Sequence, residues 1–463
     1  MSCSENSLLS RAHSRMDRFL ATPYYILGVM VLSMISHLFS LELPVYTVFI
    51  LVGIYTVLQG SDLLPLTPLF PFFYISISLN NNPGRNAKSV FSGATGIYLY
   101  TLAALFGLAV LWYIIRNFKK FIQVKRPLLP GLTLLALTYF LSGIGADKYA
   151  GVVIRRNLLF AAMQAAALLI PYLLLSGGGN WQTSRLHYLA WSGFSVACSV
   201  LPQVLYCYAT QGVIVEGAIV REKIYTGWGM YNNMGFMIAM GIPFLFYLAT
   251  KYHREYLGLA AGTVLLIGVM LTCSRTSLLF GTAIYGVCIL LMLHHAHNRR
   301  LSTILLSVLG GLGVLMLLVF HSQLLHLFSR LLSLGTDPSS RDVFLQEGLH
   351  LFAKAPVFGN SFYSPGYVPW DFAEIIEVSL VIPPRWHSTL LQLLVSCGSL
   401  GVCAYIFHRY QTIRLVLRRR NMETVFLCCA VGLLLLCSLF DCHFFNIGPT
   451  LVYSSALAFA ERN

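Results

Sequence analysis

Residues 383–401 read PPRWHSTLLQLLVSCGSLG, in which two prolines and two ionisable side chains directly precede a strongly apolar segment. Proline lacks a backbone N–H and disfavours a helical conformation in the residue before it, so a helix is expected to begin after Pro384. The apolar residues that follow are typical of a helix that crosses a membrane. The stretch therefore predicts a membrane helix with Arg385 and His387 at its entrance.

The rest of the chain has the same apolar character. Of its 463 residues, 57% are hydrophobic and 10% are charged, whereas a soluble domain has about 25% charged residues. Apolar stretches of about 18 residues or more recur, and each is long enough to cross a bilayer. Helices satisfy their own backbone polar groups in lipid, and the alternating pattern of a β-barrel is absent. We therefore predict an all-α, polytopic transmembrane helical bundle with twelve to fourteen spans.

Polarity divides the chain into four regions. Residues 1–23 are polar and basic, with no evident cleavable signal peptide, and are expected to form a cytoplasmic tail. Residues 24–320 and 387–463 contain the apolar stretches and are expected to be transmembrane. Residues 321–386 are too long for a simple connector, since loops longer than about 15 residues are usually functional or disordered. We expect them to form one large extracytoplasmic loop.

This loop is expected to contain helical structure. Residues 339–356, SSRDVFLQEGLHLFAKAP, begin with serines that can cap a helix and continue with apolar residues at helical spacing. Pro356 ends the pattern. We expect one or two amphipathic helices that lie over the outer face of the bundle.

The basic residues predict the orientation, because Lys and Arg accumulate on the cytoplasmic side of membrane proteins. With a cytoplasmic N-terminus, the clusters RNFKKFIQVKR (116–126) and HRYQTIRLVLRRR (408–420) both fall on that side. The C-terminus is then cytoplasmic too. Topology and anionic lipid at the inner face account for the net charge of +14, so we predict no nucleic-acid partner.

The eleven cysteines do not indicate a disulfide framework, because most lie inside apolar segments, where cysteine behaves as a small hydrophobe. No Cys or His cluster has the spacing of a zinc site. Cys442 and His443 are an isolated adjacent pair. We predict neither a metal ion nor another cofactor.

Four arginines and one histidine are predicted to lie on the outer side: Arg221, Arg275, Arg341, Arg385 and His387. Ionisable groups at membrane depth usually face a cavity or a partner. Arginine binds phosphate oxygens through two parallel hydrogen bonds, and histidine accepts a proton near neutral pH. This combination suits sugar transfer, in which arginines neutralise a lipid-diphosphate leaving group and a base deprotonates the attacking hydroxyl.

Each of these residues also has a simpler explanation. Arg275 is also explained as an interfacial anchor, Arg221 as a solvated loop charge, and Arg341 as a charge on a helix surface. His387 could cap its helix, and Trp386 could belong to the aromatic belt of the membrane interface. The residue types alone therefore leave the function open.

The order and spacing of four stretches of sequence narrow the possible functions. The chain resembles the O-antigen ligase and O-antigen polymerase superfamily of bacterial polytopic membrane glycosyltransferases, most strongly over residues 212–410. Four features carry the resemblance. They are a turn rich in Arg, Gly and Asn, a Ser-Arg turn, an outer-loop Arg followed by Pro-x-x-Gly, and a His at the start of a helix. In this chain they are REKIYTGWGMYNNMGF (221–236), LTCSRTSLLFG (271–281), SSRDVFLQEGLHLFAKAPVFGNSF (339–362) and WHSTLLQLLVSCGSLG (386–401).

The resemblance implies an inverting, metal-independent transfer of a glycan from an undecaprenyl-diphosphate carrier. The acceptor would be a glycan, a lipid or a protein at the extracytoplasmic face of a bacterial inner membrane. The lipid bilayer and the carrier-linked donor are the implied partners. Two alternatives stay open: a polymerase that joins repeat units on the same carrier, and a transporter of polysaccharide or lipid. No repeated halves of the transporter kind are seen.

The resemblance also implies roles for particular residues. His387 matches a histidine that acts as the base or positions the acceptor. The residues expected to bind the diphosphate are Arg221, Arg275 and Arg341. The residues expected to support His387 are Arg385, Trp386 and Ser388. The chain departs from the family pattern where Ser388 replaces an Asn and Ser361 replaces the second Gly of Pro-x-x-Gly-x-Gly.

Overall fold

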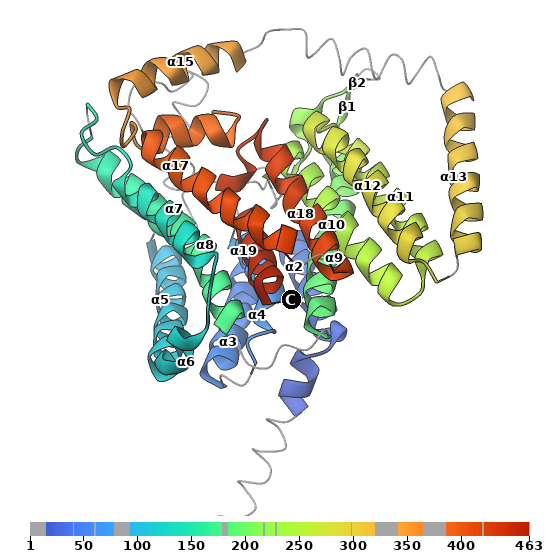
Figure 1. Ribbon diagram of the computed structural model, residues 1–463, viewed down its shortest axis with the longest axis horizontal. Helices are drawn as coiled ribbons and strands as arrows, with labels where there is room; N and C mark the ends of the chain where they lie inside the picture. The colour runs from blue at the N-terminus through green and yellow to red at the C-terminus, as the bar shows by residue number, and fades with distance from the viewer. Residues whose placement is uncertain are drawn as a thin grey trace, which may run out of the picture.

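The computed structural model describes twelve segments: residues 15–39, 41–59, 62–77, 93–147, 149–177, 184–215, 218–226, 229–297, 299–319, 341–363, 386–418 and 421–462. Helices dominate them (Figure 1), and two short two-stranded antiparallel sheets are added. The first half of the chain forms α2 (Pro23–Phe39), α3 (Glu42–Gln59), α4 (Leu66–Ile77), α5 (Gly93–Arg116), α6 (Phe118–Gln123), α7 (Leu129–Leu141), α8 (Val152–Gly177) and α9 (Ser184–Thr210).

A short segment of strands and turns and the second half of the chain follow. The segment holds β1 (Ile214–Val215), β2 (Ala218–Ile219), the 3₁₀ turn η3 (Arg221–Lys223), β3 (Tyr225–Thr226) and β4 (Gly229–Met230). The helices after it are α10 (Tyr231–Lys251), α11 (Glu255–Leu271), α12 (Arg275–His295), α13 (Arg299–Val319), α15 (Arg341–Lys354), α17 (Thr389–Arg418), α18 (Met422–Ser438), the 3₁₀ turn η5 (His443–Phe445) and α19 (Ile447–Arg462).

Within the described segments, seven helices are long and apolar enough to cross a membrane: Glu42–Gln59, Gly96–Arg116, Val153–Ser176, Leu186–Thr210, Tyr231–Lys251, Arg275–His295 and Thr389–Arg418. Four shorter apolar helices accompany them: Pro23–Ser36, Leu129–Leu141, Glu255–Leu271 and Met422–Ser438. The prediction of an all-α polytopic membrane protein is confirmed. The number of twelve to fourteen spans, the sidedness and the region boundaries stay predictions.

Helix α10 is the centre of one half of the bundle. Its residues from Met234 to Thr250 are all buried, and it packs against α9, α11, α12 and α18. A helix that is apolar on every side belongs in an interior. Small residues allow the close approach, because a Cβ on Gly241 would lie only 2.3 Å from the Cβ of Ala197 in α9.

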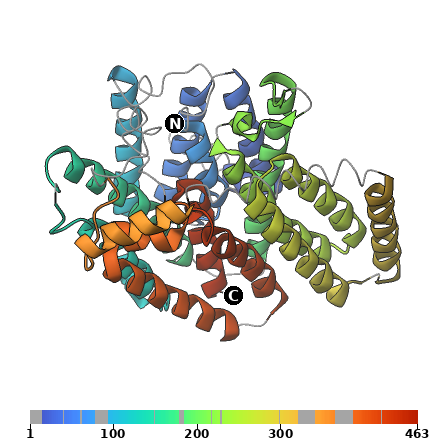
Figure 2. The ribbon, with the colours of Figure 1, turned by 90° about the horizontal axis from the view of Figure 1, so that it is seen from above.

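The other half is built on α7, α8, α17 and α19, where α17 packs against α7 and α19 against α8. Helix α15 lies across one end of the bundle and packs on α17, as Figures 1 and 2 both show. Phe344 and Leu351 of α15 form an apolar cluster there with Trp386, Leu391 and Val395 in and just before α17. One amphipathic helix of the outer loop therefore covers the bundle. Residues 320–340 and 364–385 of this loop lie outside the described segments.

Helix α17 is broken at Gly398, whose φ of 66° is not helical. Residues 356–361 of the outer loop cross the break and pair with it. The amides of Asn360 and Ser361 donate to the carbonyls of Val395 and Ser396, at 2.7 and 3.1 Å. On the other side, the amide of Ser399 donates to the carbonyl of Pro356 at 2.8 Å. The loop segment thus supplies the hydrogen bonds that the helix loses.

Beyond the break, α17 continues to Arg418. His408 and Arg409, predicted to begin a cytoplasmic basic cluster, instead lie within this helix and contact the bundle interior. His408 Nε2 and Arg409 Nη1 both reach the hydroxyl of Tyr453 in α19, at 2.7 and 2.5 Å. The Arg409 guanidinium also lies 4.9 Å from the ring centre of Phe444. Aromatic faces offset part of the cost of an arginine in an apolar surrounding.

Candidate functional site

Four segments meet at the end of the bundle where α10, α12, α17 and α19 begin. Ser277 Oγ, near the start of α12, donates to the carbonyl of Asn232 in α10 at 3.4 Å. Thr389 Oγ1, at the start of α17, donates to the carbonyl of Asp441 at 3.3 Å. Helix N-termini carry partial positive charge and exposed N–H groups. The start points of α10, α12 and α17 therefore form a surface suited to an anion.

Arg275 is the first residue of α12, and a tight turn places it there. Ser274 caps the helix, because its side chain accepts from the amide of Ser277. Cys273 has a φ of 55°, which few residues other than glycine adopt. Burial raises the pKa of the Cys273 thiol, although a hydrogen bond from Tyr208 and the charge of Arg221 act in the opposite direction. The thiol is therefore kept neutral, while Arg275 supplies positive charge.

Arg221 lies in η3, on the loop before α10. Its guanidinium stands 5.0 Å from the ring centre of Tyr231, the first residue of α10. The hydroxyl of Tyr231 interacts electrostatically with Arg221 and with Arg275. Arg221 therefore contacts this tyrosine directly, and Arg275 acts on it through its charge. Arg221 Nε also pairs with Glu222 Oε1 at 3.0 Å, and since Glu222 is 59% exposed this ion pair is weak.

His387 precedes α17 in a strained conformation. Its φ is 52°, its side chain is half-buried, and its ring centre lies 5.3 Å from that of Phe344 in α15. Ser388, rather than His387, caps α17, because its Oγ accepts from the amide of Leu391 at 3.5 Å. Strained residues persist where their surroundings hold them, and such residues concentrate at functional sites.

The buried Gln392 holds this entrance in place. Its Oε1 accepts from the amide of Trp386 at 3.1 Å, and its Nε2 donates to Ser396 Oγ at 2.9 Å. Trp386 is itself buried and packs edge-to-face on Phe344. Trp386 therefore lies in the protein interior against α15, and its expected support of His387 stays a prediction.

The side chains of two predicted residues lie outside the part of the chain that the structure describes. Arg341 begins α15, and the structure does not describe its side chain. Arg385 lies outside the described segments. Their expected roles in diphosphate binding and in support of His387 stay predictions.

Sequence reasoning missed four residues of the site: Asp441, His443, Asn446 and Asn233. The first three lie in the turn between α18 and α19, and Asn233 lies in the first turn of α10. His443 Nδ1 lies 3.2 Å from Asn233 Oδ1, which also accepts from Asn446 Nδ2 at 2.6 Å. His443 Nε2 lies 3.8 Å from Asp441 Oδ2. The available signal was a short polar segment, Asp441 to His443, between two apolar helices.

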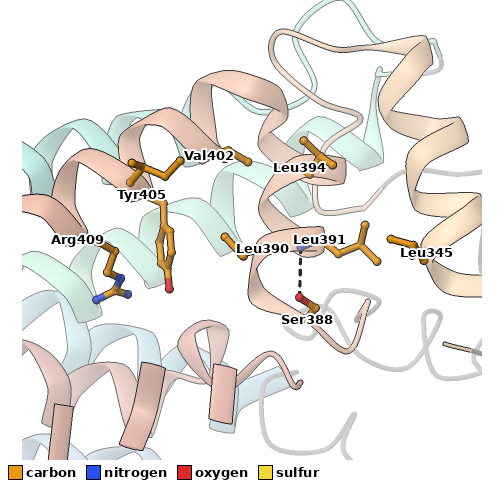
Figure 3. A pocket seen from close by; sticks show the side chains of 9 residues that line it. Leu345, Ser388, Leu390, Leu391, Leu394, Val402, Tyr405 and Arg409 are labelled. Atoms are coloured by element: carbon orange, nitrogen blue, oxygen red, sulfur yellow. Dashed lines mark hydrogen bonds between the residues drawn. The ribbon is translucent and has the colours of Figure 1, made fainter. Parts of the chain in front are cut away.

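An apolar pocket of about 560 Å³ opens beside Ser388. It lies along the two sides of the break in α17, with Leu390 and Leu394 before it and Val402 and Tyr405 after it (Figure 3). Leu345 of α15 forms one edge and Arg409 the far end. The walls suit a hydrocarbon chain. Among the described residues, no three His, Cys, Asp or Glu side chains are close enough to hold a metal ion.

The family model described as O-antigen ligase matches residues 260–406. The match contains Arg275 and His387, together with α15 and the break in α17. Comparison with curated proteins gave no significant match. The matched segment confirms the resemblance seen in the sequence. The chain is a multi-pass membrane protein that carries a domain of the O-antigen ligase superfamily.

Proposed function

We propose that the protein transfers a glycan from an undecaprenyl-diphosphate carrier to an acceptor hydroxyl at the outer end of α10, α12 and α17. The observation that carries the proposal is the position of Arg221 against the ring of Tyr231, the first residue of α10, together with the charge of Arg275, which acts on the same tyrosine. An arginine on the loop before α10 and another at the start of α12 can bind a diphosphate and neutralise the charge that develops on it as it leaves. The helix N-termini and the two arginines would together supply the positive charge that the leaving diphosphate needs, so the proposed reaction is metal-independent.

The pocket beside Ser388 would accommodate part of the lipid chain of the donor. A carrier lipid has its diphosphate at the membrane surface and its hydrocarbon in the bilayer. The apolar walls from Leu390 to Ile406 would hold the first part of that chain, while the diphosphate lies at the arginines. His387, next to Ser388 in the chain, would then lie beside the reacting groups as base or acceptor-positioning residue.

The reaction would be an inverting displacement. The acceptor oxygen attacks the anomeric carbon from the face opposite the diphosphate, and the bond from that carbon to the phosphate oxygen breaks. Helix α15, which covers the start of α17, would limit water at this point and so favour transfer over hydrolysis. The active site would face the outside of a bacterial inner membrane.

The test is made in the native host with the wild type, Arg275→Ala, His387→Ala and a control. Arg414→Ala is the matched control, because Arg414 is exposed on the same helix as the pocket. Undecaprenyl-linked glycans and surface polysaccharide are extracted and resolved by size. Long lipid-linked chains that accumulate in both site variants, with little surface glycan, support the ligase function.

Two other outcomes would change the proposal. Accumulation of single repeat units on the carrier would indicate the polymerase reaction with the same donor. If neither pool changes in either variant, the proposed transfer is wrong, and transport of polysaccharide or lipid becomes the better hypothesis.

A further inference from the structure

The turn between α18 and α19 is rigid and penetrates the bundle. The amide of Asp441 donates to the carbonyl of Cys437 at 3.0 Å, and the amide of Phe445 donates to the carbonyl of Cys442 at 2.9 Å. His443, Phe444 and Phe445 are all buried. On one side of η5, Phe444 contacts Arg409, and on the other, His443 stacks on Phe236 of α10 with ring centres 4.7 Å apart. The polar residues of this turn are therefore held in fixed positions.

The hydrogen bonds around His443 determine where its ring carries a proton. Asn233 Oδ1 accepts from Asn446 Nδ2, so it is the oxygen of Asn233 that faces His443 Nδ1. An amide oxygen can only accept, so His443 Nδ1 must donate. In the neutral ring, Nε2 then carries a lone pair and faces Asp441 Oδ2 at 3.8 Å. A lone pair that faces a carboxylate is unfavourable, and a proton taken up by the pair removes the repulsion.

Asp441 connects this histidine to the arginines. One of its oxygens, Oδ1, accepts from the amide of Cys442 at 2.7 Å, and its side chain is 12% exposed. Asp441 also interacts electrostatically with the hydroxyl of Tyr231, on which the charges of Arg221 and Arg275 act as well. Its carbonyl accepts from Thr389 Oγ1 at 3.3 Å, so Asp441 lies beside both the buried imidazole and the start of α17, which follows His387.

We propose that Asp441 is the base that takes the proton from the acceptor hydroxyl, and that His443 is the positioning residue that stabilises this proton on the pair. The inference rests on the proposed glycan transfer. The acceptor O–H bond breaks and its proton passes to Asp441. The acceptor oxygen bonds to the anomeric carbon, and the electron pair of the broken carbon–oxygen bond stays on the diphosphate. His387 is then left to position the acceptor.

Other ionisable groups face the pair and set its charge balance. From α18, Cys437 interacts with Asp441, and from α10, Tyr231 does so. Around Tyr231, η3 brings Arg221 and Glu222, and α12 brings Arg275. The positive charges of Arg221 and Arg275 and the carboxylates of Glu222 and Asp441 therefore all act on Tyr231.

The test uses right-side-out membrane vesicles from the native host, in which the chromosomal copy is replaced by plasmid-borne variants. The probe is the lipid-linked glycan already in these vesicles, and the rate of its transfer is measured as a function of external pH. Asp441→Asn keeps the size of the side chain but removes the base, so the rate should fall about 10²-fold or more. Asp441→Glu should restore part of it. Leu439→Ala, exposed in the same turn, is the control and should match the wild type.

His443→Gln keeps a donor toward Asn233 but removes the second ring nitrogen. The rate should fall about 10-fold, and the acid limb of the pH profile should shift, because a positioning residue acts through the base. Thermal unfolding of each purified variant checks that the fold is intact. A wild-type rate in Asp441→Asn, or a His443→Gln profile that is lower but unshifted, overturns the inference. A wild type that transfers no glycan overturns the proposed function itself.

Discussion

Gly359 and Gly398 pack backbone against backbone, so that a Cβ atom on Gly398 would lie 2.7 Å from the amide nitrogen of Gly359. The two glycines belong to the outer loop and to the broken helix α17. Both have positive φ, 70° and 66°. This contact joins the loop segment to the helix, and it aligns the first part of α17, which follows His387, with the rest of the bundle.

Gly398→Ala should destabilise the protein by at least about 2 kcal/mol, because a side chain there is strained in backbone conformation and would also meet the carbonyl of Val357 at 2.4 Å. Thermal unfolding in detergent measures the change. Gly432→Ala is the control, since no atom lies within 4 Å of its added Cβ. Equal stability of the two variants would show that the loop does not need this glycine.

Asn157→Ala should loosen the outer loop. Asn157 Oδ1 accepts from the amide of Phe362 and from Ser361 Oγ, both at 3.1 Å, and the residue is fully buried. Loss of these bonds leaves buried donors unpaired, at a cost of about 1–3 kcal/mol. Hydrogen exchange at the Phe362 amide should accelerate, whereas the exposed Thr101→Ala should leave it unchanged. An unchanged rate in Asn157→Ala would contradict this anchoring.

Gln392→Leu should lower glycan transfer without removing any charged group from the site. The leucine leaves the buried amide of Trp386 without its acceptor, so the strained backbone at His387 loses its support. Transfer should fall together with the protection of the Trp386 amide against hydrogen exchange. If transfer stays at the wild-type rate while that protection is lost, His387 does not depend on this hydrogen bond.

Tyr453→Phe should destabilise the bundle by about 1–3 kcal/mol. The lost hydroxyl is the shared partner of His408 Nε2 and Arg409 Nη1, and both are left in an apolar interior. Tyr410→Phe is the control, because Tyr410 is 57% exposed on α17, the helix of His408 and Arg409. Denaturation midpoints compare the two, and a Tyr453→Phe midpoint equal to that of Tyr410→Phe would be the contrary result.

Arg275→Lys should reduce transfer about 10²-fold or more, because an ammonium group cannot reproduce the planar pair of donors that binds a diphosphate. Arg414→Lys, exposed on α17, should behave as wild type. Transfer rates in host membranes measure both. An active Arg275→Lys protein would indicate that Arg275 only anchors the turn at the interface.

The sequence predicted some features of the site well. The Ser-Arg turn before α12 and the helix that starts at Arg341 are both present where local pattern placed them. Capping, periodicity and proline act over a few residues, so they can be read directly from the chain. The break at Gly398 could not be predicted in this way, because a lone glycine in an apolar stretch is compatible with a continuous helix. It depends on the hydrogen bonds that residues 356–361 donate and accept.

Sequence alone determined that this chain is a helical membrane protein and that it resembles the O-antigen ligase superfamily, since apolar length and motif order are properties of the chain itself. Only the tertiary structure brought Asn233 to His443, 210 positions later, and Arg221 to the ring of Tyr231. The packing of α10 against α12 and α18 decided these contacts. The pairing of polar side chains across a bundle depends on which helices pack together, and the apolar faces that drive this packing do not specify partners in the sequence.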